Sequence, residues 1–238
     1  MSLIFPLADQ DVRSAKTTKG SMAYGQLGMM ADGRTYQFSG IDSTGLASGQ
    51  LAVAEADADN HVDLSVAAAA IGAKEVTVTL GATAATADQY AEGYLNVRDG
   101  TGEGHYYKIQ GHPAADASAT LKIRLYNPIE VALVASGTSQ VDLAKHPAKD
   151  CGRSATLAKA VGVSNIVFAA STYGWLQKTD YCSVISDGTP AKNQRVIQSN
   201  GTAGSVEVQA ETDIIETVGI VLETLVNAEH KAVALSIA

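Results

Sequence analysis

The turn-forming residues of this chain constrain its fold more than any other feature. Asp-Gly pairs, the dipeptide that tight hairpins with positive φ favour, occur at 32–33, 99–100 and 187–188. Between the turns, apolar residues recur at every second position, most clearly in EVTVTL at 75–80 and LKIRLY at 121–126. Short alternating segments separated by turns are typical of a sandwich or barrel. We therefore expect an all-β fold of sandwich-like or barrel-like domains built from hairpins.

The expected strands cover most of the chain after the first thirty residues. The segments on either side of the loop DGTGEG, 94–98 and 105–110, are expected to pair as a hairpin. Alanine favours a helix at 66–73, but Gly72 and the short length allow at most two turns, and 86–92 has room for one. We therefore expect at most one short helix. The other expected strands are 34–38, 75–80, 121–126, 130–134, 160–169, 173–178, 181–186, 195–198, 205–209, 214–225 and 231–237.

The first thirty residues differ from the rest in being a polar ribbon with isolated apolar side chains. This composition predicts an extended N-terminal arm at 1–30 that gains order by lying on a partner, although a frayed terminus fits nearly as well. The apolar side chains of the arm are the candidate interface residues, namely Ile4, Phe5, Leu7 and Tyr24.

The strand pattern is interrupted around residues 127–149. Pro128, the polar run SGTSQ and the KHP segment at 145–147 fall in this stretch. We expect a domain boundary there, with one β domain at 31–135 and a second at 136–238.

Composition bears on the classes of partner. The chain has 17 Lys and Arg against 25 Asp and Glu, and the basic residues are spread along it, so no nucleic acid partner is expected. No apolar run approaches the roughly 20 residues of a membrane span, and the start lacks the pattern of a secretory signal. Only 18% of residues are charged, which suits a surface partly covered by a partner or by copies of the chain.

The two cysteines, Cys151 and Cys182, do not form a C-x-x-C pair, so metal or redox use is not expected. We interpret them as buried, reduced thiols of a protein made in a cytoplasm.

No motif in the sequence predicts a catalytic, cofactor or metal site. The glycine string at 100–104 precedes a strand, whereas a phosphate-binding loop requires a helix there. The acidic run at 55–63 lacks the Gly and Glu spacing of a calcium loop, which favours a solvated loop. The five histidines form no H-E-x-x-H pair, and no G-x-S-x-G occurs. We expect no enzyme, although a triad of distant residues would leave no local pattern.

Two aromatic groups, Tyr106-Tyr107 and Tyr173-Gly174-Trp175, fall on expected strands. On a strand, one member of each group points inward and the other outward. Trp175 is expected in the core with a tyrosine at its rim. Exposed aromatic side chains can anchor a protein interface or stack on sugar rings.

Several longer segments with the same mixture of alternating strands and glycine-containing turns occur in order along the chain. They are DGRTYQF at 32–38, GYLNVRDGTGEGHYYKI at 93–109, YGWLQ at 173–177, DGTPA at 187–191, VGIVLE at 218–223 and VALSI at 233–237. In style and order they resemble the capsid decoration or cement proteins of tailed bacteriophages. The resemblance spans 30–238 and contains no catalytic fingerprint. Cys182 and the surrounding KTDYC stretch depart from it without an assignable role.

The resemblance implies a virion structural protein that binds the outside of an expanded capsid and stabilises the shell. Its partner would be the major capsid protein, with self-association into oligomers such as trimers, no cofactor, and a place on the capsid exterior after synthesis in the bacterial cytoplasm. Many weak contacts repeated over symmetric sites would supply avidity. Two alternatives stay open: a head-fibre or tail-associated module that binds host glycans, and a particle-associated hydrolase.

Overall fold

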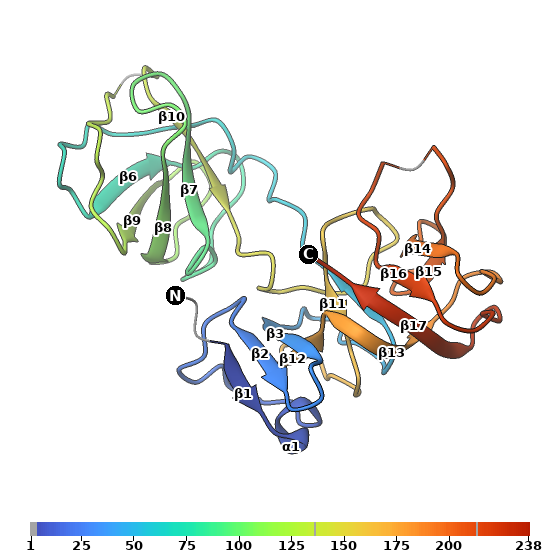
Figure 1. The fold of residues 1–238 in the computed structure, drawn as a ribbon. Coiled ribbons are helices and arrows are strands. Elements are labelled where there is room, and N and C mark those ends of the chain that lie inside the picture. The colour runs from blue at the N-terminus through green and yellow to red at the C-terminus, as the bar shows by residue number, and fades with distance from the viewer. Residues whose placement is uncertain (1–3, 136, 213) are drawn as a thin grey trace. The chain divides into compact units, whose positions relative to one another are not determined.

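The computed structural model describes residues 4–135, 137–212 and 214–238, and in these ranges it contains seventeen strands and one helix (Figure 1). The expected all-β fold with one short helix is confirmed. That helix, α1 (Asp9–Val12), lies in the supposed arm. It begins where the Asp11 carboxylate accepts a hydrogen bond of 2.9 Å from the Ala8 N–H. The alanine-rich segment 66–73 forms isolated bridges instead of a helix.

The chain forms two compact units, and one is inserted into the other. The two-sheet unit combines the chain up to Glu55 with Pro147–Ala238, and the barrel unit is Ala56–His146. This division differs from the expected one at 31–135 and 136–238. The interruption expected around 127–149 contains a strand, β10 (Gln140–Ala144), which pairs with β7 (Tyr94–Asp99) of the barrel unit.

The barrel unit consists of one six-stranded sheet that nearly closes on itself (Figure 1). Val66, directly after the first strand in the sheet order, bridges to Val78 on the last one, so the two edges meet. Closure leaves few unpaired backbone groups at the edges. In sheet order the strands are β5 (Leu64–Ser65), β10, β7 (Tyr94–Asp99), β8 (Tyr106–Gly111), β9 (Thr120–Leu125) and β6 (Glu75–Thr79).

Alternation along the strands fills this barrel. On β9, Leu121, Ile123 and Leu125 are at most 1% exposed, whereas Lys122 and Arg124 between them are exposed. The alternation expected from LKIRLY is therefore confirmed. Each fully buried aliphatic side chain contributes roughly 1.5–3 kcal/mol to folding relative to an exposed one.

The two-sheet unit holds the other two sheets. Its six-stranded sheet runs β1 (Phe5–Leu7), β2 (Leu27–Met30), β3 (Thr35–Gly40), β12 (Tyr173–Gln177), β11 (Ala160–Val163) and β4 (Leu51–Val53). Its five-stranded sheet runs β13 (Thr179–Ile185), β17 (His230–Ser236), β16 (Gly219–Val221), β14 (Arg195–Gln198) and β15 (Val206–Val208).

One apolar cluster joins these two sheets. Leu51 and Val163 come from the six-stranded sheet, and Val184, Val196 and Val233 come from the five-stranded sheet. All five side chains are fully buried. The small β-branched residues that dominate the cluster suit the surface of a pleated sheet.

The N-terminal segment differs from the extended arm expected at 1–30. Strand β1 pairs in parallel with β2 and forms the edge of the six-stranded sheet. Leu7 and Val12 belong to a buried cluster around Trp175. The side chains of Leu7 and Trp175 can pack this closely against β2 only because residue 28 is glycine. A Cβ there would lie 2.5 Å from Leu7 Cδ1 and 2.9 Å from Trp175 Cζ3.

Three expected strands are shorter in the structure. Within 130–134 there is one isolated bridge at Leu133, 160–169 is a strand only as far as Val163, and 214–225 contains only β16. Conversely, β1, β2, β4, β5 and β10 were not expected. These strands have two to five residues, too few for periodicity to distinguish them from loops.

Candidate functional site

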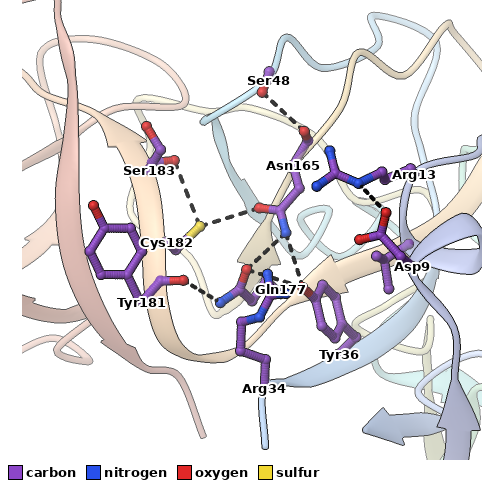
Figure 2. A pocket seen from close by; sticks show the side chains of 11 residues that line it. Asp9, Arg13, Arg34, Tyr36, Ser48, Asn165, Gln177, Tyr181, Cys182 and Ser183 are labelled. Atoms are coloured by element: carbon purple, nitrogen blue, oxygen red, sulfur yellow. Dashed lines mark hydrogen bonds and ion pairs between the residues drawn. The ribbon is translucent and has the colours of Figure 1, made fainter. Parts of the chain in front are cut away.

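A pocket of about 210 Å³ opens in the two-sheet unit, lined by residues of α1, β3, β12 and β13 and by the loop after β11 (Figure 2). Its lining is mainly polar, with two Arg side chains, an amide pair and a thiol. We describe it as the candidate site because convergent polar groups in a concave place are what ligand binding requires.

Asn165 lies at the centre of the hydrogen bonds in this pocket (Figure 2). Its Nδ2 donates to Gln177 Oε1 over 2.8 Å and to Tyr36 Oη over 3.3 Å. Its Oδ1 accepts a bond of 3.3 Å from Cys182 Sγ. Both ends of this amide are therefore engaged within the protein.

Gln177 continues the network into the backbone. Its Nε2 donates to the carbonyl oxygens of Thr179 and Tyr181, over 2.8 and 2.9 Å, and the residue is only 1% exposed. Because Gln177 ends β12 while the two carbonyls belong to β13, the amide holds together the junction between the two sheets. This buried network stabilises the fold at that junction.

The charged groups at the rim are paired. Arg34 donates to the Asp32 carboxylate over 2.8 Å, and Arg13 donates to Asp9 over 2.6 Å. The hydrogen bond from Arg34 lowers the pKa of Asp32, and the same bond raises the pKa of Arg34. Each of the two guanidinium groups is thus neutralised by a neighbouring carboxylate.

The thiols are protonated at neutral pH. Burial raises the pKa of Cys182 to about 12, and burial likewise raises the pKa of Cys151 to about 12. A nucleophilic or metal-binding cysteine requires the thiolate, which these environments disfavour. Both cysteines are free and buried, as expected from the sequence.

The candidate interface residues separate into two pairs. Leu7 and Tyr24 are each only 8% exposed and belong to buried clusters, whereas Ile4 and Phe5 are 47% and 40% exposed. Phe5 and Leu7 share one face of β1, and alternation places Ile4 on the other face. The register pairs Phe5 with Gly28, so Leu27 and Met29 lie on the face of Ile4. We call Ile4, Leu27 and Met29 the outer edge patch.

A second polar cluster lies inside the barrel unit. Tyr90 Oη is bonded to His61 Nδ1, while His61 Nε2 donates to the Thr83 carbonyl over 2.9 Å. His112 Nε2 accepts from the Tyr90 N–H over 3.0 Å and its Nδ1 lies 2.8 Å from the Pro113 carbonyl. Each bond has a definite donor and acceptor if both imidazoles are neutral, so the cluster is consistent with a structural role.

Tyr106 and Tyr107 alternate as predicted, whereas Tyr173 does not point outward, because it lies two residues from Trp175 on the same face of β12 and packs against the same buried cluster. Trp175 is 2% exposed, and Tyr107 is 6% exposed while Tyr106 beside it is 69% exposed. The glycine string at 100–104 connects the hairpin of β7 and β8.

Some functional groups of the pocket were missed at the sequence level. Asn165 and Gln177 stand in apolar contexts, and nothing local distinguishes a buried amide from a surface one. The only signal is Gln177 directly after the apolar residues of YGWLQ.

Residues 4–135, 137–212 and 214–238 contain neither a cluster of metal ligands nor a helix that could span a membrane. There, no group of three or more His, Cys, Asp or Glu is placed to hold a metal ion, and the acidic run at 55–63 forms none. No helix in the part of the chain that the structure describes is long and apolar enough to cross a membrane.

Comparisons with known proteins add no relative to this description. A scan against protein-family models, a search of curated proteins and a search of solved structures each gave no match.

Proposed function

We propose that this chain is a structural protein of a tailed-phage particle that binds the outer surface of the capsid and stabilises the shell. The observation that carries the binding role is the outer edge patch beside the unpaired side of β1. Ile4, Leu27 and Met29 are 47%, 36% and 43% exposed, and they adjoin the edge of a sheet. The phage assignment rests on the resemblance in the order of the segments.

An exposed sheet edge with apolar neighbours is suited to binding an extended segment of another chain. Because β1 is the edge of its sheet, an added strand can pair with it, although Pro6 at its centre carries no N–H to donate to that strand. The patch would then be covered by apolar side chains of that strand. The partner in this proposal is the major capsid protein, and repetition over the symmetric shell multiplies a modest affinity.

The proposal predicts that purified protein sediments with expanded shells of its own phage that lack this gene product, and raises their resistance to heat. A Leu27→Asp, Met29→Asp double variant is expected to lose this binding, because charges on the patch oppose its burial. Val167→Asp, a matched change at a side chain that is 70% exposed in the same unit, should bind as the wild type does.

Circular dichroism and urea unfolding show whether both variants are folded, so that a loss of binding can be attributed to the patch and not to unfolding. A folded double variant that still binds would exclude the patch as the contact surface. Failure of the wild type to bind expanded shells would overturn the function itself.

A glycan-binding module of a head fibre or tail is the second candidate. It is favoured by the exposed tyrosines Tyr106 and Tyr126, which are 69% and 46% exposed on the barrel unit.

A further inference from the structure

The outer face of the barrel unit carries three tyrosines, two on neighbouring strands and one directly after a third strand. In the register of β7 and β8, Tyr94 is opposite Lys108 and Asn96 is opposite Tyr106, while the alternate residues point into the barrel. The rings of Tyr94 and Tyr106 meet edge to face, with centroids 6.0 Å apart. Tyr126 follows β9, and its N–H donates to the Lys108 carbonyl over 3.0 Å. The three rings are therefore gathered around Lys108.

A groove of about 390 Å³ lies beside the Tyr106 ring, between β8 and the segment 127–130, whereas Tyr94 and Tyr126 do not line it. This volume is within the range of about 300–1,000 Å³ that small-molecule sites occupy. The segment is held in place because Tyr107 Oη accepts a hydrogen bond of 3.2 Å from the Glu130 N–H, and Tyr107 itself is buried. The groove is thus formed before any ligand arrives.

The groove combines exposed aromatic surface with separate polar groups. Lys108 Nζ lies 5.7 Å from the centroid of the Tyr126 ring, and Lys108 also lines the groove. Asn127 and Glu130, both exposed, line it with an amide and a carboxylate. Hydrogen-bond donors and acceptors therefore lie around the exposed ring of Tyr106.

We propose that this groove binds a pyranose oligosaccharide. A pyranose has an apolar C–H face that can lie on a tyrosine ring, and hydroxyl groups at its rim that both donate and accept hydrogen bonds. The groove supplies the ring in Tyr106, donors in Lys108 and Asn127, and an acceptor in Glu130.

Two other kinds of ligand fit less well. A protein partner would need an apolar interface core continuous with its aromatic anchors, but the exposed aliphatic side chains of this unit, Val62, Ile71 and Val134, do not line the groove. A nucleic acid would require several free cations. On this face Arg98 lies 3.5 Å from Asp142, and Lys122 lies 3.2 Å from Glu75.

This inference goes beyond shell binding and does not rest on it, since the groove and the outer edge patch belong to different units. A protein that decorates a shell and also binds glycans would hold the particle near a glycan-coated surface.

The test is a titration of the full-length, isotope-labelled protein with chitotriose, cellotriose, maltotriose and a galactose trisaccharide, each to 20 mM, followed by NMR. Saturable shifts are expected in the rings of Tyr106 and Tyr126 with at least one of these sugars. Tyr106→Ala is expected to weaken that binding at least tenfold. Ile71→Ala, at a side chain 68% exposed in the same unit that does not line the groove, is the matched control and should bind as the wild type does.

The variants are compared only if their backbone spectra show an intact barrel. Tyr126→Ala is the second variant should Tyr106→Ala disturb the fold. If none of the four sugars produces a saturable shift at these tyrosines, or if both Tyr variants bind with unchanged affinity, the proposal is wrong. The shell-binding variants at Leu27 and Met29 are expected to keep sugar binding, so the two proposals fail independently.

Discussion

Phe5 lies stacked on Trp175, with ring centroids 6.2 Å apart and planes 19° from parallel. The first described strand of the chain therefore covers one of the largest buried side chains of the two-sheet unit. Phe38, the cross-strand partner of Trp175, also contacts the indole, and its ring meets it edge to face at 5.4 Å. Because these contacts hold β1 against the sheet, the N-terminal segment is part of the fold, and its outer face remains available to a partner.

Truncating Phe5 should loosen β1. We expect Phe5→Ala to lower the free energy of unfolding by about 1–2 kcal/mol, since the ring is partly buried and stacked. Trp175 is the only tryptophan, so its fluorescence should move to longer wavelength as water reaches it. Ile4→Ala, on the other face of the strand, is the control and should leave the emission unchanged. An unchanged emission in Phe5→Ala would contradict the stacking.

Adding one methyl group at Gly28 should have a larger effect than its size suggests. The new Cβ would lie 2.5 Å from Leu7 Cδ1 and 2.9 Å from Trp175 Cζ3, so β1 has to move away. We expect Gly28→Ala to cost about 1–3 kcal/mol, as overpacking of a core does. Urea unfolding followed by far-ultraviolet circular dichroism measures the loss. Gly33→Ala is the comparison that separates overpacking from backbone strain. Its Cβ would meet no atom within 4 Å, so any loss of stability in this variant comes from the positive φ of +93°.

The amide network of the pocket can be tested with a nearly isosteric change. Asn165→Asp replaces the donating Nδ2 by an oxygen that would face Gln177 Oε1, now 2.8 Å from the nitrogen. We expect a loss of about 2 kcal/mol at neutral pH, because a donor is replaced by a repelling acceptor. Asn200→Asp, at an exposed position of the same unit, should change the stability little. Equal stability of the two variants in urea would show that the network contributes nothing.

Alkaline pH should destabilise the two-sheet unit through its thiols. Burial raises the folded-state pKa of Cys151 and of Cys182 from 9.0 to about 12. Above pH 9 the unfolded chain releases protons that the folded chain retains, so the free energy of unfolding falls as pH rises from about 9 towards 12. The loss is about 1.4 kcal/mol per thiol by pH 10, one pH unit above the unfolded pKa.

The corresponding measurement compares wild type with a Cys151→Ala, Cys182→Ala variant in urea at pH 7.5 and pH 10. The variant is less stable at both values, because it has lost buried atoms, but its stability should fall less between them. Tyr and Lys titrate in both proteins, so only the difference between the two profiles is informative. Parallel profiles would mean that the thiols ionise as readily in the folded protein as in the unfolded chain.

Much of the barrel unit was predictable because four of its six strands, β6, β7, β8 and β9, are five or six residues long and alternate between buried and more exposed side chains. LKIRLY places Leu121, Ile123 and Leu125 inward whatever surrounds them, and the Asp99-Gly100 turn determines the hairpin of β7 and β8. The pairing partner of each strand was not predictable. That β10 closes against β7 depends on contacts between residues some 40 positions apart, which no local pattern records.

The sequence by itself determined the all-β class, the turns, the inward side chains of the longer strands and the burial of Trp175. These features depend on the period of two and on positive φ, which neighbouring residues decide. Only the tertiary structure decided that the N-terminal segment is an edge strand, that one unit is inserted into the other, and that Asn165 meets Gln177. Such contacts arise when distant strands pair and bury their shared faces, so their information is distributed over the whole chain.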